Sequence, residues 1–152
     1  MTQASFIAPY RLSPSSPNTI YAATNRVYKS TNGALTWSPT GSNAPLDGNP
    51  ILSMAISYNS SDTVYVATAP INQRSGVFRT TNGGLSWQNV TDILPDRYPM
   101  DLAVDPTNAQ RVYLALSGFG SDHIWRSFDG GDSWQSANSG IPDAPASAVI
   151  VD

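Results

Sequence analysis

The sequence predicts an all-β fold of repeated four-stranded antiparallel units, and three observations support this prediction. The first is composition: 12% of the 152 residues are charged, no Glu is present, and Lys29 is the sole lysine. Because Glu and Lys favour helices whereas Gly, Pro, Asn, Ser and Thr favour turns, this balance indicates short strands joined by many turns. The second is an octad that occurs three times and ends in Trp. The third is an apolar block that precedes each octad.

The octad recurs at a nearly constant spacing. Its copies read STNGALTW (30–37), TTNGGLSW (80–87) and SFDGGDSW (127–134), so their tryptophans lie 50 and 47 residues apart. Self-similarity at such a period is typical of repeat architectures, in which each repeat is one supersecondary unit. The octad therefore marks the same place in three successive units.

Each unit is expected to contain four short strands. Innermost strands are predicted at 53–57, 101–105 and 147–152, with 6–13 as a looser version, and second strands at 19–23, 63–67 and 111–115. Third strands are predicted at 27–29, 77–79 and 124–126, and short polar outer strands at 38–40, 88–90 and 135–137. Four strands per repeat, with second strands apolar on both faces, is the pattern of a β-propeller blade that has a neighbour on each side.

The domain prediction is a single partial propeller unit over residues 1–152. Blade 1 spans about 5–41, blade 2 about 51–91 and blade 3 about 100–137, and 147–152 supplies the first strand of a fourth blade. Closed propellers have about four to eight blades, so three blades leave two blade faces open. Two arrangements are expected to cover these faces: head-to-tail association of copies, with two chains forming six blades, or adjoining blades of a longer chain.

The octads fit the pattern Ser/Thr-x-Asp/Asn-x-Gly-x-Ser/Thr-Trp, with Ala34 at the Gly position of the first copy. Over essentially its whole length the chain thereby resembles the Asp-box, or bacterial neuraminidase repeat, β-propellers. That group includes sialidases, xyloglucan-degrading glycoside hydrolases, sortilin-type receptor domains and photosystem assembly factors.

The resemblance implies that each octad forms the hairpin between the third and fourth strands of a blade. In such a hairpin Asp or Asn caps turn amides, Gly supplies a positive φ, and Trp pins the hairpin to the blade. The structural octad residues are then Ser30, Asn32, Trp37, Thr80, Asn82, Gly84, Trp87, Ser127, Asp129, Gly131 and Trp134. The resemblance also implies an extracellular or periplasmic protein. Residues 1–5 lack the basic and apolar regions of a signal peptide, so a trimmed chain is expected if the natural protein is exported.

No catalytic residue is predicted. The family pattern of sialidases includes a Tyr–Glu nucleophile pair, which a chain without Glu cannot carry, and none of the 11 Asp residues form a pair that matches a family catalytic site. His123 beside Asp122, in a chain without Cys, is too sparse a ligand set for a metal, so neither metal nor cofactor is predicted. A net charge of −3 argues against nucleic acid, and the apolar runs are shorter than the ~20 residues of a membrane span.

Binding is expected at the loops that differ between repeats. From the aligned Tyr to the octad Trp the repeats count 16, 22 and 21 residues, so repeats two and three carry extra residues at 69–76 and 117–123. Because strand direction alternates, these loops share a rim with the inter-blade loops 38–50, 88–99 and 135–146, opposite the octads. The candidate binding residues on this rim are Arg74, Asp96, Arg97, Tyr98, Phe119, Asp122 and His123.

Two functions fit these observations. The favoured one is a non-catalytic binding or scaffold module that takes a glycan or protein ligand, because the repeated residues serve the scaffold and no catalytic pair is found. The alternative is a fragment of a secreted glycoside hydrolase whose catalytic residues are divided between this chain and further blades.

Overall fold

The structure is a computed structural model that describes residues 8–152, and in that range it contains three four-stranded antiparallel sheets and no helix. Blade 1 consists of β1 (Tyr10–Ser13), β2 (Ser16–Ala23), β3 (Val27–Ser30) and β4 (Ser38–Pro39). Blade 2 consists of β5 (Ile51–Ile56), β6 (Val64–Thr68), β7 (Val77–Thr80) and β8 (Gln88–Asn89). Blade 3 consists of β9 (Pro99–Val104), β10 (Val112–Leu116), β11 (Ile124–Ser127) and β12 (Gln135–Ser136).

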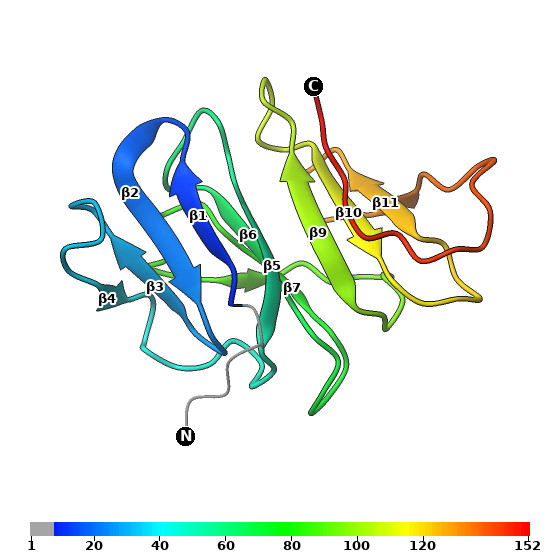
Figure 1. Cartoon of the computed structure of the whole chain (residues 1–152), viewed down its shortest axis with the longest axis horizontal. Helices are drawn as coiled ribbons and strands as arrows, with labels where there is room; N and C mark the ends of the chain where they lie inside the picture. The colour runs from blue at the N-terminus through cyan, green and yellow to red at the C-terminus, as the bar shows by residue number, and fades with distance from the viewer. Residues whose placement is uncertain (1–7) are drawn as a thin grey trace.

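The three blades stand side by side in chain order, and β5 of blade 2 lies between β1 and β9 (Figure 1). Within each blade the strands are hydrogen-bonded in sequence order, so every connection inside a blade is a hairpin. The predicted all-β fold of four-stranded antiparallel blades is confirmed.

The second strand of blade 2 shows why the sequence is apolar on both of its faces. All five residues of β6 are buried. Val64 and Val66 belong to the core between blades 1 and 2, whereas Tyr65 and Ala67 belong to the core between blades 2 and 3. Because successive side chains of a strand point to opposite faces, a sheet that is covered on both sides needs apolar residues at every position.

The outer strands β4, β8 and β12 contain two residues each, and all six residues are exposed. Such short polar edges offer few free backbone groups to another strand. The blades can therefore extend the core by stacking face to face, and they resist the addition of a fifth strand at the outer edge.

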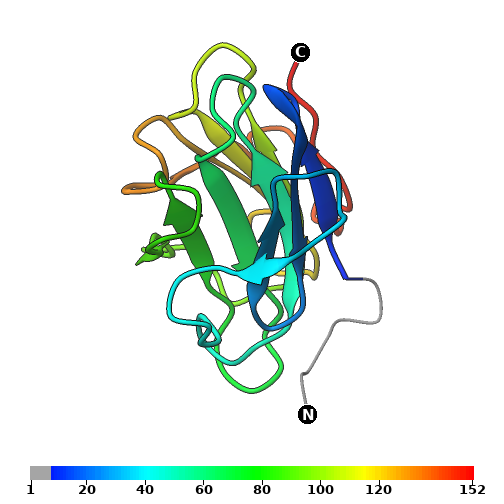
Figure 2. The same cartoon turned by 90° about the vertical axis from the view of Figure 1, so that its left-hand side faces the viewer.

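Loops gather at the two ends of the sheets (Figure 2). At one end, which we call the octad rim, each octad hairpin lies against the turn between the first two strands of its blade; Gly83 N, for example, donates to Asp62 O at 2.9 Å. At the other end, the loop rim, the β2–β3, β6–β7 and β10–β11 connections meet the inter-blade loops. Ile51 N donates there to Thr24 O at 2.7 Å.

The two ends of the chain differ from the strands predicted for them. β1 begins at Tyr10, and residues 6 and 7 of the predicted first strand lie outside the described residues. Residues 147–152 form no strand, although their path begins as blade 2 begins: Ala146 N donates to Leu116 O at 3.1 Å, at the place that corresponds to the Ile51–Thr24 bond. The first strand of a fourth blade therefore stays a prediction.

Candidate binding surface on the loop rim

The octad hairpins hold their own turn amides. In the third copy Ser127 Oγ accepts a hydrogen bond from Gly131 N at 2.7 Å, and Asp129 Oδ1 accepts one from Ser133 N at 2.9 Å. The corresponding bonds of the first two copies measure 2.9–3.0 Å. These side chains are committed to hydrogen bonds inside the hairpin, so the octad rim offers few free polar groups to a ligand.

Asp129 carries a charge that the first two octads lack. Hydrogen bonds from the hydroxyl and the N–H of Ser133, together with one from the Ser127 hydroxyl, lower the pKa of Asp129 to about 2. Donors aimed at a carboxylate favour its ionised form. Asn32 and Asn82 accept the same backbone bond without charge.

The octad tryptophans contact the preceding blade. Trp134 is 3% exposed and donates from Nε1 to Val90 O at 2.8 Å, and Trp87 donates to Thr40 Oγ1 at 3.2 Å. Trp37 belongs to the first blade among the described residues; it is 37% exposed and lies beside the Tyr10 ring at 6.0 Å between centroids. The pinning role that the resemblance implies is therefore exerted between blades.

On the loop rim, a buried asparagine that the sequence analysis missed organises the 69–76 loop. Asn49 is fully buried, and its Nδ2 donates to Gln73 O at 3.1 Å and to Arg74 O at 3.2 Å. Its Oδ1 accepts from Asn72 N at 2.8 Å. A single side chain thus replaces the strand partners that this loop lacks, since buried polar groups must be paired.

Two of the predicted rim residues tie the 69–76 loop to the next inter-blade loop. Arg74 donates to the carbonyl oxygens of Asp92 and Leu94, and Asp96 Oδ1 accepts from Ser75 N at 2.9 Å. The hydrogen bonds of both side chains therefore go to backbone groups of the protein's own loops, although both residues are exposed at the surface.

Three other predicted residues, of which Tyr98 and Phe119 are exposed and Arg97 is half-buried, form a group that we call the rim patch. Arg97 donates to Phe119 O at 3.2 Å, and Ser117 N donates to Tyr98 O at 2.9 Å. These bonds join the inter-blade loop to the β10–β11 loop. Tyr98 and Phe119 are 47% and 65% exposed, and Arg97 beside them is half-buried, so the two aromatic rings are the accessible part of the rim patch.

Gly118 allows this approach. Its φ is 103°, a conformation that residues with a Cβ rarely adopt. A Cβ at this position would lie 2.8 Å from Arg97 Cδ. Glycine is therefore required where the Arg97 side chain crosses the loop.

His123 is not part of the exposed surface, and this expectation is corrected. Its side chain is fully buried: Nε2 lies 2.9 Å from Asp143 Oδ1, and its backbone N donates to Asn138 Oδ1 at 2.9 Å. Asp143 also accepts from Gly120 N at 3.0 Å, so one carboxylate joins the His123 ring to the β10–β11 loop. Asp122 stays at the surface, in a hollow of about 330 Å³ that Asp143 and Ile141 also line.

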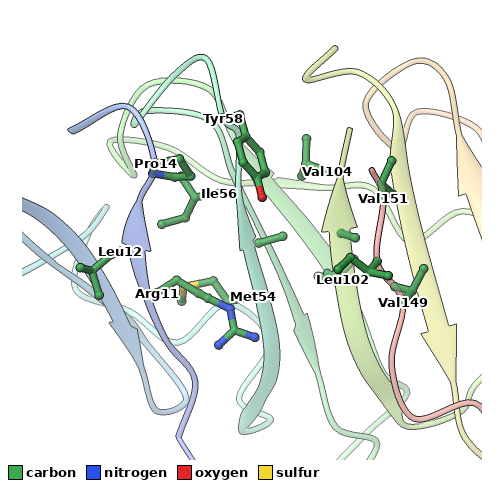
Figure 3. A pocket seen from close by; sticks show the side chains of 13 residues that line it. Arg11, Leu12, Pro14, Met54, Ile56, Tyr58, Leu102, Val104, Val149 and Val151 are labelled. Carbon is green, nitrogen blue, oxygen red and sulfur yellow. The ribbon is translucent and has the colours of Figure 1, made fainter. Parts of the chain in front are cut away.

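A second hollow of about 250 Å³ follows the inner strands β1, β5 and β9 and the segment 149–151. Figure 3 shows Arg11 and the hydroxyl of Tyr58 pointing into it, between Met54 on one side and Leu102 on the other. Arg11 lies 4.0 Å from Asp101. This hollow is the inner edge of the arc of blades, where a closed propeller has its central channel.

Within residues 8–152 no group of three or more His, Cys, Asp or Glu residues is placed to hold a metal ion. The same part of the chain has no helix long and apolar enough to cross a membrane.

Solved structures with this arrangement of strands include three that are informative. The GH74 xyloglucanase from Xanthomonas campestris matches with a TM-score of 0.70 and 21% identity over 94% of this chain and 22% of its own. A GH74 enzyme from Niastella koreensis matches with a TM-score of 0.65 and 22% identity over 89% of this chain and 23% of its own. YCF48 bound to D1 peptide matches with a TM-score of 0.59 and 16% identity over 90% of this chain and 45% of its own.

No protein-family model matches the sequence, and no curated protein matches it. The chain spans less than a quarter of the length of the GH74 enzymes and less than half of that YCF48 chain. At these identities the likeness establishes the fold. The chain is an arc of three β-propeller blades, and its neighbours in fold include glycoside hydrolases and a peptide-binding propeller.

Proposed function

We propose that the chain is a non-catalytic binding or scaffold module of the Asp-box propeller type, and that its ligand contacts the rim patch. The supporting observation is the exposure of Tyr98 and Phe119 beside half-buried Arg97, on loops that are tied to each other by hydrogen bonds. Aromatic rings and Arg supply much of the binding energy at recognition surfaces, because they offer large contact areas with polar ends. A glycan or a peptide fits this chemistry.

The Asp-box assignment itself is part of this proposal. The common hydrogen-bond pattern of the three octads supports it, and so does the likeness to GH74 enzymes and YCF48. With that assignment we propose an extracellular or periplasmic location. The open faces of blades 1 and 3 would be covered by further blades, either from a second copy or from a longer chain.

The second candidate is a fragment of a glycoside hydrolase. The hollow that Asp122 and Asp143 line on the loop rim favours it, because glycosidases place two carboxylates beside the scissile bond. The GH74 enzymes with the same arrangement of blades give a substrate to test, xyloglucan.

Binding and turnover assays separate the two candidates. The purified chain is applied to arrays of xyloglucan and β-glucan oligosaccharides and of peptides, and the release of reducing ends from xyloglucan is measured in parallel. We expect binding that the double variant Tyr98→Ala/Phe119→Ala abolishes and that Leu35→Ala/Leu85→Ala, which removes exposed side chains on the octad rim, leaves intact. Release of reducing ends would favour the hydrolase. Binding to neither array, or loss of binding in the octad-rim variant alone, would overturn the proposal.

A further inference from the structure

Asn precedes Gly at two places in the sequence, and both lie in octads: Asn32-Gly33 and Asn82-Gly83. Asn is a chemically labile residue, because the backbone N of the residue after it can attack the carbonyl carbon of its side chain. Gly favours this attack, since it has no Cβ to obstruct the approach. Both Asn residues are exposed, so water reaches their side chains. The two dipeptides are therefore candidates for spontaneous deamidation.

Deamidation needs no reagent other than water. The Gly N gives up its proton and forms a bond to Cγ of the Asn, while the bond from Cγ to Nδ2 breaks. The side-chain nitrogen takes up a proton and leaves as ammonia. Water then opens the cyclic succinimide at one of its two carbonyl carbons. One opening gives Asp, and the other gives isoaspartate, in which the main chain runs through the former side chain and is one methylene longer.

The folded hairpin opposes this reaction because it commits the Asn side chain to other partners. Asn82 Oδ1 accepts from the Thr80 hydroxyl at 2.9 Å and from Ser86 N at 3.0 Å. Its Nδ2 donates to the Ser86 hydroxyl at 2.8 Å. The corresponding bonds of Asn32 measure 2.8–3.0 Å. Cyclisation requires Cγ to approach the N of the next residue, and the side chain must give up these bonds to do so.

The attacking nitrogen is held as well. Gly83 N donates to Asp62 O at 2.9 Å, and Gly33 N donates to Asn18 O at 3.0 Å. Each acceptor belongs to the same blade as its Gly. The nitrogen must leave this bond before solvent can remove its proton, as in amide hydrogen exchange. Ring closure should therefore occur only while the hairpin is open.

The third octad shows what an Asp does at this position. Asp129 Oδ1 accepts from Ser133 N at 2.9 Å, and Oδ2 accepts from the Ser133 hydroxyl at 2.5 Å. The next residue, Gly130, donates from its N to Gln110 O at 2.8 Å, as the corresponding glycines do in the other octads. A carboxylate thus makes the same hairpin with the hydroxyl turned to donate, which a hydroxyl can do.

The two products of deamidation should therefore differ in their fit to the hairpin. Asp at position 82 needs only a rotation of the Ser86 hydroxyl, which now accepts from Asn82. Isoaspartate adds a methylene to the main chain between positions 82 and 83, which would shift Gly83 N relative to Asp62 O. The hairpin is compatible with the first product and incompatible with the second.

From these contacts we infer that Asn32 and Asn82 are two latent deamidation sites, which the octad hairpin protects while it is folded and which convert when it opens. Conversion to Asp gives each site the residue type that the third octad already has, and adds one negative charge. The sites lie on the octad rim, so the inference is independent of any ligand of the rim patch on the opposite rim.

Incubation at mildly alkaline pH, with and without urea, tests the protection. Peptide mass mapping then measures the conversion at each Asn. At Asn32 and Asn82 we expect roughly tenfold or more slower conversion in the folded chain, because several hydrogen bonds must open together. Asn43 and Asn89, which precede residues with a Cβ, are internal controls and should convert far more slowly than both sites in urea. Equal rates with and without urea, or faster conversion at a control position, would overturn the inference.

Variants of the hydroxyl that binds each Asn distinguish opening of one hairpin from opening of the whole chain. Thr80→Ala should raise the rate at Asn82 in the folded chain by roughly three- to tenfold, as the loss of one hydrogen bond implies, and leave Asn32 unchanged. Ser30→Ala should do the reverse. Thr80→Ser keeps a hydroxyl, as in the other two octads, and should keep the original rate. Equal acceleration at both sites would show that the hairpin is not what protects them.

Refolding separates the two products. The chain that has been incubated in urea is refolded, and the folded fraction is digested and analysed. We expect this fraction to be enriched in Asp over isoaspartate at positions 32 and 82, relative to the mixture in urea. Asn82→Asp, made as a direct control, should fold with a melting temperature close to that of the unaltered chain. The same proportion of isoaspartate in the folded fraction as in urea would contradict the fit described for the two products.

Discussion

The third octad position is filled by two different residue types that do the same structural work. Asn32 and Asn82 each accept a backbone N–H and donate from Nδ2 to a hydroxyl at 2.8 Å. Asp129 accepts the same N–H, and its other oxygen accepts from the Ser133 hydroxyl at 2.5 Å. The carboxylate therefore adds a charge, and with it a dependence on pH that the amides do not have.

Acid unfolding tests this difference. Because the pKa of Asp129 is lowered to about 2 in the folded state, its contribution to stability is present above its ordinary value of 3.8 and is lost as pH falls through about 2. Asp129→Asn should remove that part of the pH dependence and lower the unfolding free energy at neutral pH by about 0.5–1.5 kcal/mol, the net worth of a hydrogen bond. Urea unfolding at several pH values measures both. If the unfolding free energy of the variant falls with decreasing pH as steeply as that of the unaltered chain, then the Asp129 carboxylate does not have the lowered pKa described above.

The three octad tryptophans should differ in what they contribute to the stability of the single chain. Trp134→Ala removes a ring that is 3% exposed and should cost about 3–5 kcal/mol, the usual range for aromatic truncation in a core. Trp87→Ala should cost less, and Trp37→Ala should cost about 1 kcal/mol or less at low protein concentration, because no blade covers that ring. Thermal unfolding of the three variants ranks them. An equal decrease in melting temperature for all three variants would contradict the assignment of each tryptophan to a contact with the preceding blade.

At the scale of the elements, the strands could be predicted and the loop contacts could not. The octads and apolar blocks occur in three copies, so each copy supports the same strand assignment in the other two. The predicted second strand 63–67, for example, differs from β6 (Val64–Thr68) by one residue at each end. Asn49 and His123 each occur once. Their partners, the carbonyl of Gln73 and the carboxylate of Asp143, are 24 and 20 residues away, and no local pattern connects them. Tertiary contact alone determines that both side chains are buried.

Asn49→Ala should loosen one loop while the sheets persist. The substitution leaves the carbonyls of Gln73 and Arg74 and the N–H of Asn72 without this partner, at a cost of roughly 1–3 kcal/mol. Hydrogen exchange should accelerate over residues 69–76 and stay unchanged in β10. Uniform acceleration throughout the chain would mean that Asn49 supports the whole core.

The rim patch should be separable from the fold. Arg97→Ala/Tyr98→Ala removes side chains that are partly or largely exposed, so the unfolding free energy should change by about 1 kcal/mol or less, the usual range for surface substitutions. The same variant should weaken any ligand of the loop rim. Binding that survives this change, and is lost when the octad hairpins are altered, would place the ligand on the opposite rim.

At the scale of the whole molecule, two inter-blade cores are complete and two blade faces are open. Association would bury those faces, so the melting temperature should rise with protein concentration, as it does whenever binding favours the folded state. Trp37→Ala should flatten this dependence, because the corresponding tryptophans of blades 2 and 3 contact the preceding blade. Scanning calorimetry over a hundredfold range of concentration measures both. A melting temperature independent of concentration in the unaltered chain would argue against self-association.

The junction between blades 1 and 2 uses the same kinds of contact as the junction between blades 2 and 3, and this has a consequence for how a propeller gains blades in evolution. Each blade gives the next a tyrosine hydroxyl and a cation, and receives an indole N–H in return. Tandem duplication of the segment that encodes one blade would therefore create a new junction from contacts that already exist, with no change in the neighbouring blades. Ring size becomes a quantity that gene duplication can adjust in single steps, while the loops of each added blade remain free to diverge.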